Sequence, residues 1–111
     1  MNEILEQSLL YDFYGELLTD KQREIYEQYI LDDLSLKEIA DEMQITRQGI
    51  HETIKRSLAA LYEYEGKLHL VEKFLSIKNN VKEINLLISQ MKETEETDRI
   101  KSVLDEILRE L

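Results

Sequence analysis

The sequence predicts an all-α fold, and three observations support this expectation. Proline is absent and glycine occurs only three times, so little interrupts helices. Sustained alternation of apolar and polar residues, which predicts strands, is missing. Leucine, isoleucine, glutamate, lysine and glutamine are abundant instead, and these residues favour helices or fit their buried faces. The length of 111 residues suits one compact domain, or one small domain with an extended attachment.

Two helices are expected in the first 33 residues. The first covers residues 3–17, and the second begins at a capping box in which Thr19 precedes Gln22 by three positions. The second helix is expected to end near Asp32-Asp33. Their apolar stripes comprise Ile4, Leu9, Leu10, Phe13, Tyr14, Leu17 and Leu18 in the first helix, and Ile25, Tyr26, Tyr29 and Ile30 in the second.

Two further patterns predict a third and a fourth helix. Ser35 and Glu38 form a second capping box, which begins a short third helix. After the tight connection Gln44-Ile45, Thr46 can cap a fourth helix that starts at Arg47. The residues expected to point inward are Leu36, Ile39, Ala40 and Met43 in the third helix, and Ile50, Ile54, Leu58 and Leu61 in the fourth.

Residues 35–58 together have the pattern of a helix-turn-helix. This motif needs a small residue where two helices cross, a tight turn, and a second helix with one buried and one free face. Ala40 supplies the small residue and Ile45 fills the turn, while Ile50 and Ile54 anchor the second helix. A plain three-helix core whose polar residues form a solvated face is the alternative interpretation.

In a DNA-binding helix-turn-helix, the free face and N-terminal end of the second helix enter the major groove. At about 100° per residue, the polar residues of the fourth helix lie opposite or beside its apolar row. Arg47 could pair with guanine edges and Gln48 with adenine, while hydroxyls at helix N-termini suit phosphates. The candidate residues for binding double-stranded DNA are Ser35, Thr46, Arg47, Gln48, His51, Lys55 and Arg56.

The charge of the chain argues against a surface that is basic throughout. The formal net charge is −10 and the isoelectric point is about 4.6. Residues 1–34 hold nine acidic and two basic side chains, whereas residues 46–56 hold three basic and one acidic. That acidic residue, Glu52, would repel phosphates from the expected reading face.

Gly49 costs about 1 kcal/mol of helix stability relative to alanine, and would allow close approach either to DNA or to a neighbouring helix.

From residue 66 onwards the pattern changes. Gly66 is expected to end or kink the fourth helix. Apolar residues then alternate three and four apart over three heptads, which is coiled-coil spacing. A helix over residues 67–92 is expected, either unbroken or divided near Ser76 and Asn79-Asn80. The heptad residues are Leu70, Phe74, Ile77, Val81, Ile84, Ile88 and Met91.

A linker over residues 92–96 and a last helix, capped by Thr97 or Asp98, complete the predicted chain. We therefore divide the sequence into a helix-turn-helix domain, 1–65, and a helical extension, 66–111, which is expected to mediate dimerisation. A homodimer is favoured because helix-turn-helix proteins commonly bind paired half-sites. The alternative is that the extension folds back onto the first two helices. The last helix has Ile100, Val103, Leu104, Ile107, Leu108 and Leu111 at its apolar positions.

Other classes of protein are disfavoured by what the sequence lacks. Cysteine is absent, which excludes disulfides, thiol catalysis and Cys-ligated zinc. The two histidines, His51 and His69, are far apart, and neither a nucleophile elbow nor a Gly-rich phosphate loop is present, so we expect no enzyme, metal or cofactor. No apolar run approaches the ~20 residues of a membrane span. The acidic N-terminus differs from a signal peptide, so a cytoplasmic protein is expected.

Several of these residues recur together in a known family: Asp32-Asp33-Leu34-Ser35, Glu38-Ile39-Ala40, Ile45-Thr46-Arg47-Gln48 and Ile54-Lys55-Arg56. With these, the chain resembles the YlxM family of small Gram-positive proteins from about residue 5 to residue 75. More distantly, the motif is similar to region 4 of sigma factors, whose helix-turn-helix reads promoter DNA. The sequence departs from the usual pattern of this motif at two positions. Gln44 stands where such turns often have glycine, and Gly49 lies inside the recognition helix.

The resemblance implies a DNA-binding or regulatory protein, encoded beside the genes for Ffh and FtsY of the signal recognition particle pathway. Two functions are therefore considered. The first is a dimeric helix-turn-helix regulator that binds DNA. The second is an adaptor that does not bind DNA and instead binds components of the signal recognition particle machinery.

Overall fold

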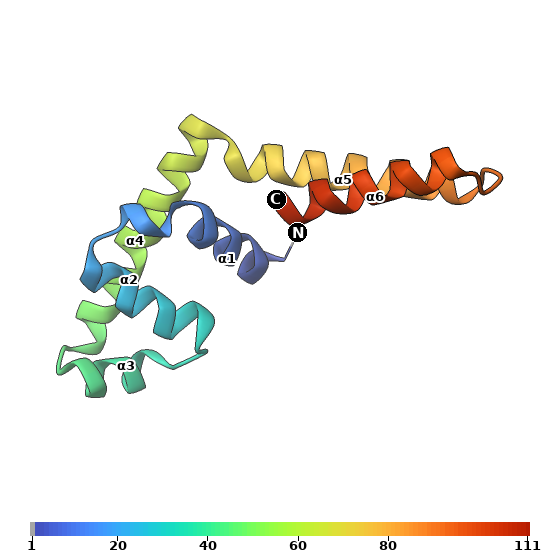
Figure 1. Cartoon of the computed structure of the whole chain (residues 1–111). Helices are drawn as coiled ribbons and strands as arrows, with labels where there is room; N and C mark the ends of the chain where they lie inside the picture. The colour runs from blue at the N-terminus through green and yellow to red at the C-terminus, as the bar shows by residue number, and fades with distance from the viewer. Residues whose placement is uncertain (1) are drawn as a thin grey trace. The chain divides into compact units, whose positions relative to one another are not determined.

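The structure is a computed structural model that describes residues 2–111, and within them the chain is helical and contains no strand (Figure 1). It divides into two compact units, one that ends at Val71 and one that comprises Glu72–Leu111. The expected all-α, helix-turn-helix fold is confirmed. Each unit is described separately below.

The first unit contains four α-helices, whose order is α1 (Glu3–Tyr14), α2 (Asp20–Tyr26), α3 (Leu36–Met43) and α4 (Arg47–Leu68). A 3-10 turn, η1 (Gly15–Leu17), follows α1, and a π-helical turn, η2 (Glu27–Leu31), extends α2. The long helix α4 contacts α1, α2 and α3, and the core of the unit therefore lies along it.

Local hydrogen bonds set where these helices begin. Thr19 Oγ1 accepts from the amide of Gln22 at 3.2 Å, and the Gln22 side chain accepts in return from the Thr19 amide at 3.0 Å. Ser35 and Glu38 form the same reciprocal pair, with both distances 3.1 Å. The two capping boxes predicted from the sequence are confirmed.

The π turn η2 changes which residues of this segment are buried. The predicted stripe places Tyr29 inside, but its side chain is 38% exposed, whereas Gln28 is buried. A π turn widens the helix locally, so residues beyond it leave the 3.6-residue spacing.

Ile4 and Leu17, also expected inside, are likewise exposed. The prediction is confirmed for Leu10, Tyr14, Leu18, Ile25 and Tyr26, which are buried.

Aromatic residues pack α1 against α2. The ring of Tyr11 stacks on Tyr26 with centroids 5.1 Å apart, and the Tyr26 hydroxyl donates to the carbonyl of Gln7 at 2.7 Å. Tyr11 also donates to the carboxylate of Glu27. Burial raises the pKa of Tyr26, and burial together with Glu27 raises that of Tyr11.

The end of α4 differs from the prediction. Gly66 lies within the helix, and α4 continues to Leu68. His69 then takes a left-handed conformation (φ 57°), and a new helix, α5 (Leu70–Ser89), begins. The break therefore falls at His69 within the expected 67–92 helix, and not near Ser76 and Asn79-Asn80.

Side chains from elsewhere in the first unit satisfy the first amides of α5. The Leu70 amide donates to the Tyr14 hydroxyl at 3.1 Å, and the Val71 amide donates to Glu65 Oε1 at 3.0 Å. The Tyr14 hydroxyl donates to the same carboxylate oxygen at 2.6 Å. These bonds give acceptors to two N–H groups at the start of α5, which a helix start otherwise leaves without partners in its own helix. Tyr14 has a raised pKa, caused by burial first and by Glu65 second.

The second unit is a helical hairpin. Helix α5 continues through it to Ser89, and α6 (Glu95–Glu110) returns alongside in the antiparallel direction (Figure 1). The core of this unit comprises Val81, Ile88 and Leu104, with Ile107 and Leu108 packed against it. Helix α6 begins earlier than predicted, because Thr94 Oγ1 accepts from the Thr97 amide at 3.1 Å. Thr97 is therefore the third residue of the helix and not its cap.

Candidate nucleic-acid interface

The helices α3 and α4 form a helix-turn-helix with a turn of three residues, Gln44 to Thr46. Gln44 ends α3 in a left-handed conformation (φ 56°), and its amide donates to the Ala40 carbonyl. The Ile45 amide donates to the same carbonyl at 3.1 Å. Thr46 is extended, and its hydroxyl accepts from the Gly49 amide at 3.0 Å, so α4 begins at Arg47 as expected.

A compact apolar cluster fixes the two helices. Ile39 and Ala40 of α3 are buried, as are Ile25 of α2 and Ile50 and Ile54 of α4. The partly buried residues that pack against this cluster are Leu34, Leu36, Met43, Ile45 and Leu58. The small side chain of Ala40 lies where the helices approach each other, as the motif requires.

The buried row of α4 departs from the prediction at one position. Ile50, Ile54 and Leu61 are buried as expected, but Leu58 is only partly covered, and Ser57 is fully buried in the row. The Ser57 hydroxyl donates to the carbonyl of Thr53 at 2.8 Å, so its burial leaves no unmet donor. An apolar pattern alone does not reveal this serine.

The outer surface of α4 is open. All seven predicted DNA-binding residues are exposed: Ser35, Thr46, Arg47, Gln48, His51, Lys55 and Arg56. Arg47, Lys55 and Arg56 make no ion pair with acidic side chains of residues 2–111. Glu52 is exposed on the same helix. Three cationic side chains thus remain available to a ligand along the first three turns of α4.

Gly49 has a local packing role. A Cβ atom at this position would lie 2.8 Å from Cγ2 of Ile45 and 3.1 Å from Oγ1 of Thr46. The glycine therefore makes space for the turn that precedes its own helix. The sequence left two explanations for this glycine, close approach to DNA or to a neighbouring helix. The contact with Ile45 accounts for the glycine without either of them.

The N-terminal ends of α3 and α4 differ in charge. Glu38 lies in the first turn of α3, and hydrogen bonds from Ser35 lower the pKa of its carboxyl. A carboxylate thus already occupies the end of α3 that would attract a phosphate. The first turn of α4 has no acidic residue. Since a helix N-terminus attracts anions, the Thr46 end is the more favourable phosphate position.

A groove of about 680 Å³ borders the same face of α4. Ile4 from α1, Tyr29 from η2 and Leu36 from α3 contribute to its apolar lining. His51 and Lys55 of α4 line it as well, so two of the predicted DNA-binding residues also border an apolar depression. The sequence did not reveal this groove, because it depends on the exposed positions of Ile4 and Tyr29.

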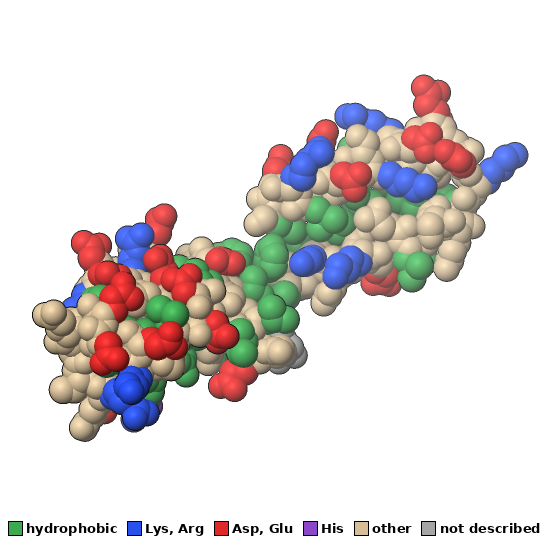
Figure 2. Space-filling model, turned by 90° about the horizontal axis from the view of Figure 1, so that it is seen from below, with side chains coloured by type: hydrophobic (Ala, Val, Ile, Leu, Met, Phe, Trp, Pro, Cys, Tyr) green, Lys and Arg blue, Asp and Glu red, His purple; other side chains and the backbone are tan. Residues whose placement is uncertain are grey.

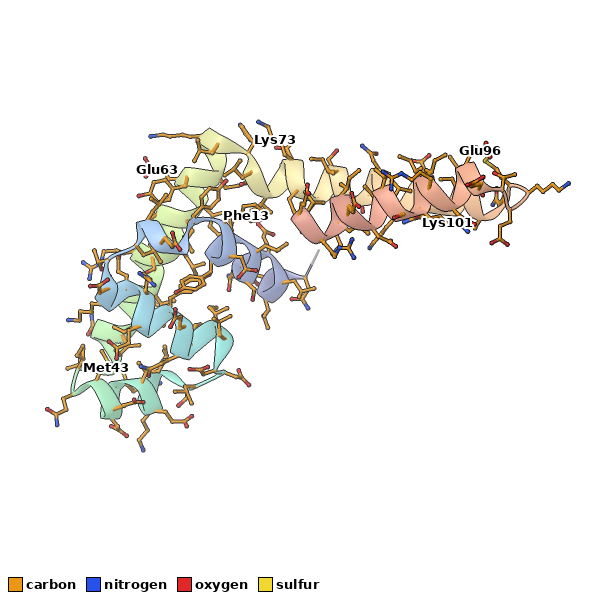
Figure 3. All side chains as sticks on the ribbon, in the orientation of Figure 1. Phe13, Met43, Glu63, Lys73, Glu96 and Lys101 are labelled. Carbon is orange, nitrogen blue, oxygen red and sulfur yellow. The ribbon has the colours of Figure 1, made fainter. Side chains whose placement is uncertain are left out.

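The side chains of the chain are shown together in Figure 3, where Met43 marks the end of α3 before the turn. Among residues 2–111, no group of His, Asp and Glu side chains is arranged to hold a metal ion. Nor does any helix in this part of the chain have the length and apolar character needed to cross a membrane.

These features define the class of the molecule as a helix-turn-helix protein. A sequence model described as “Putative helix-turn-helix protein, YlxM / p13 like” matches residues 1–103, and the chain belongs to this family, UPF0122. The resemblance to YlxM proteins is thereby confirmed. The family description names a helix-turn-helix protein and no reaction.

Relatives from several bacteria match almost the whole chain. A UPF0122 protein of Thermoanaerobacter sp. (strain X514) is 44% identical over 110 residues, which cover 99% of this chain and 94% of the relative. A UPF0122 protein of Acetivibrio thermocellus is 39% identical, covering 97% and 98%. One from Bacillus cereus (strain 03BB102) is 41% identical, covering 96% of each.

Proposed function

We propose that this protein is a regulator that binds double-stranded DNA through the exposed face of α4, and that it acts as a homodimer. One observation carries the proposal. A well-packed helix-turn-helix presents Arg47, Lys55 and Arg56 unpaired on its second helix, whose first turn lacks acidic residues. In this arrangement the N-terminal end of α4 enters the major groove.

The roles follow from side-chain chemistry. Arg47 donates to the O6 and N7 atoms of guanine, and Gln48, one residue further, pairs with adenine. Thr46 and the free amides of the first turn of α4 contact a phosphate. His51, Lys55 and Arg56 follow the phosphate backbone further along α4. Ser35 is the weakest of the seven positions, because the Glu38 carboxylate lies beside it.

Salt dependence of DNA affinity tests the proposal. Each neutralised phosphate contributes a slope of about −0.9 to the dependence of log affinity on log salt concentration. The double variant Arg47→Ala/Lys55→Ala is expected to bind more weakly, because Arg47 contacts guanine. It should also flatten that slope by about one such contribution per protomer, because Lys55 contacts a phosphate. DNA sequences for the assay come from unbiased selection with the purified protein.

A charge-matched control separates this site from general electrostatics. The double variant Lys21→Ala/Lys67→Ala removes two exposed positive charges that lie outside the motif, and it should keep the slope of the wild type. If the control loses as much affinity as the test variant, α4 does not read DNA. Ordinary non-specific binding reaches a Kd of about 1 µM even at physiological salt, and it is tighter at low salt. If no duplex binds more tightly than about 1 µM at low salt, the DNA-binding proposal therefore fails.

The groove favours a second candidate function. Its apolar lining beside exposed Ile4 and Tyr29 suits a protein segment better than a phosphate backbone. We propose, as the alternative, an adaptor that binds components of the signal recognition particle machinery.

Purified Ffh and FtsY are the partners to test. Ile4→Lys in the groove should abolish their binding, whereas Leu5→Lys, at an equally exposed neighbour outside the groove lining, should not.

A further inference from the structure

Helix α5 carries two parallel rows of residues, each with alternating steps of four and three. The inner row contains Val81 and Ile88, which pack with Leu104 of α6. Each residue of the outer row directly precedes a residue of the inner row in the sequence, and every residue of the outer row is exposed. The inner row comprises Phe74, Lys78, Val81, Asn85 and Ile88, and the outer row comprises Lys73, Ile77, Asn80, Ile84 and Leu87.

Helix α6 repeats this arrangement. Its inner row includes buried Thr97 and Leu104 and half-buried Leu108. Its outer row again lies one residue earlier at each step and comprises Glu96, Ile100, Val103, Ile107 and Glu110. Four of these residues are exposed, and Ile107 is half-buried because it also packs against the core. The exposed apolar members of the two outer rows leave between 37% and 54% of their surface uncovered.

The two outer rows lie on one face of the hairpin. One residue earlier means a rotation of about −100° around a helix. Because α5 and α6 are antiparallel and their inner rows face each other, the same rotation in both helices points both outer rows to the same side. Figure 2 shows hydrophobic side chains along the hairpin between charged residues of both signs. We call the ten outer-row residues the outer face.

The outer rows are also in register with each other. Residues equally far from the loop over 90–94 lie at the same level of an antiparallel hairpin. Five levels result, and they pair Lys73 with Glu110, Ile77 with Ile107, Asn80 with Val103, Ile84 with Ile100, and Leu87 with Glu96. Figure 3 labels Lys73 at the start of α5 and Glu96 at the start of α6, at opposite ends of the hairpin.

We propose that the outer face binds the outer face of a second copy of this chain, and that the two hairpins form a four-helix bundle. The twofold axis runs along the helices, so that α5 of each protomer lies over the α6 of its partner. Such an axis keeps each residue at its level, and the five levels become five layers of the bundle core. This assigns an interface to the homodimer of the proposed function and does not depend on DNA binding.

Charge favours this axis over a perpendicular one. Helix α5 has three lysines and two glutamates, whereas α6 has six acidic and three basic residues. A parallel axis places Lys73 over the partner's Glu110. A perpendicular axis would instead place α6 over α6 and Glu110 over the partner's Glu96, which are like charges.

Asn80 supports a helical partner of defined register. It is the middle residue of its row, with Ile77 and Ile84 on either side. A single asparagine in an apolar seam fixes the register and number of helices at some expense of stability. With a parallel axis, Asn80 and the partner's Asn80 share one layer and can hydrogen-bond to each other.

Sedimentation equilibrium of the full chain, without DNA, tests the interface. The wild type should have twice the protomer mass of 13.2 kDa. Ile84→Lys places a charge within the outer face, one level from its middle, and should weaken association by roughly 100-fold, as loss of a buried interface residue can do. The matched control Leu86→Lys changes a 61%-exposed leucine of α5 that belongs to neither row, and it should remain dimeric.

Three further variants make the proposal specific. Glu110→Lys should weaken the dimer, and Lys73→Glu combined with Glu110→Lys should restore it. Asn80→Ile should still associate but should lose the single oligomeric state. Circular dichroism checks that each variant keeps its helices.

The proposal is overturned by a monomeric wild type, by equal loss in Ile84→Lys and Leu86→Lys, or by a tighter dimer in Glu110→Lys. A monomer that still binds DNA with the salt slope of α4 would overturn the interface and the homodimer but not the DNA-binding proposal. A dimer that binds no DNA would overturn the DNA-binding proposal alone.

Discussion

The substitution Gly49→Ala should destabilise the protein, although alanine is the better helix former. Helix propensity alone favours alanine by about 1 kcal/mol. The new Cβ would, however, lie 2.8 Å from Cγ2 of Ile45, a distance at which one of the two must move. Ile45 is β-branched and packs against the core of the motif, so it cannot rotate away easily.

The net effect can be estimated from these two opposing contributions. Overpacking of this kind costs roughly 1–3 kcal/mol, so the expected loss after the gain in propensity is about 1 kcal/mol. For a domain of 60–100 residues, such a loss lowers the melting temperature by about 4–8 °C. Thermal and urea unfolding, followed by circular dichroism at 222 nm, measure it.

Gly66→Ala is the matched control, because it makes the same change in the same helix. Gly66 is exposed, and a Cβ there would meet nothing within 4 Å. This variant should therefore gain stability by up to about 1 kcal/mol. Opposite signs for the two variants would establish the contact with Ile45. Equal stabilisation by both would refute the reasoning and leave Gly49 without a structural role.

Three other predictions concern the turn of the motif, the start of α5 and the ionisation of the buried tyrosines. Gln44→Gly should stabilise the protein by about 1 kcal/mol in urea unfolding, because only glycine adopts φ 56° without strain; no gain would contradict the assigned left-handed turn. Tyr14→Phe should lower the free energy of unfolding by about 1–3 kcal/mol, since it removes an acceptor from the Leu70 amide and a donor to Glu65. Hydrogen exchange of the Leu70 amide should accelerate, and unchanged exchange would argue against this cap. Stability should fall above about pH 10, because the raised pKa values of Tyr14 and Tyr26 mean that these phenols ionise first in the unfolded chain. Phenylalanine at either position should reduce that fall, and identical alkaline profiles would contradict it.

The parts of the fold that depend on neighbouring residues were predictable from sequence. A capping hydroxyl acts on an amide three residues away, so Thr19, Ser35 and Thr46 could be identified without knowledge of tertiary structure. The inward residues of α3 and the anchors Ile50 and Ile54 follow from helical spacing alone. For the same reason, the helix-turn-helix was evident before its geometry was known.

The errors occur where apolar spacing does not decide the outcome. The break at His69 is stabilised in part by Tyr14, more than fifty positions earlier, whose hydroxyl accepts from the Leu70 amide. Ser57 can be buried because its hydroxyl donates to a carbonyl of α4, and an apolar pattern does not detect such a residue. The π turn at η2 shifts the exposure of Gln28 and Tyr29 without a proline or glycine to signal it. The groove depends on that shift and was therefore missed as well.

The uneven charge of the chain links the two proposals. Residues 1–34 carry most of the acid, and Figure 2 shows clusters of Asp and Glu on the part that holds the first helices. These charges oppose the approach of DNA, while residues 46–56 have an excess of only two positive charges. If α4 reads DNA as proposed, one such helix would therefore bind it only weakly. In the proposed dimer, two α4 helices joined through the outer face would bind DNA as a linked pair, and the second contact would form at a local concentration of about millimolar when the geometry permits. The number of phosphates contacted doubles as well, so the salt slope of a dimer should be about twice that of a monomer. In the dimer that we propose, the apolar outer face would thus supply affinity that the sparse positive charge of α4 lacks.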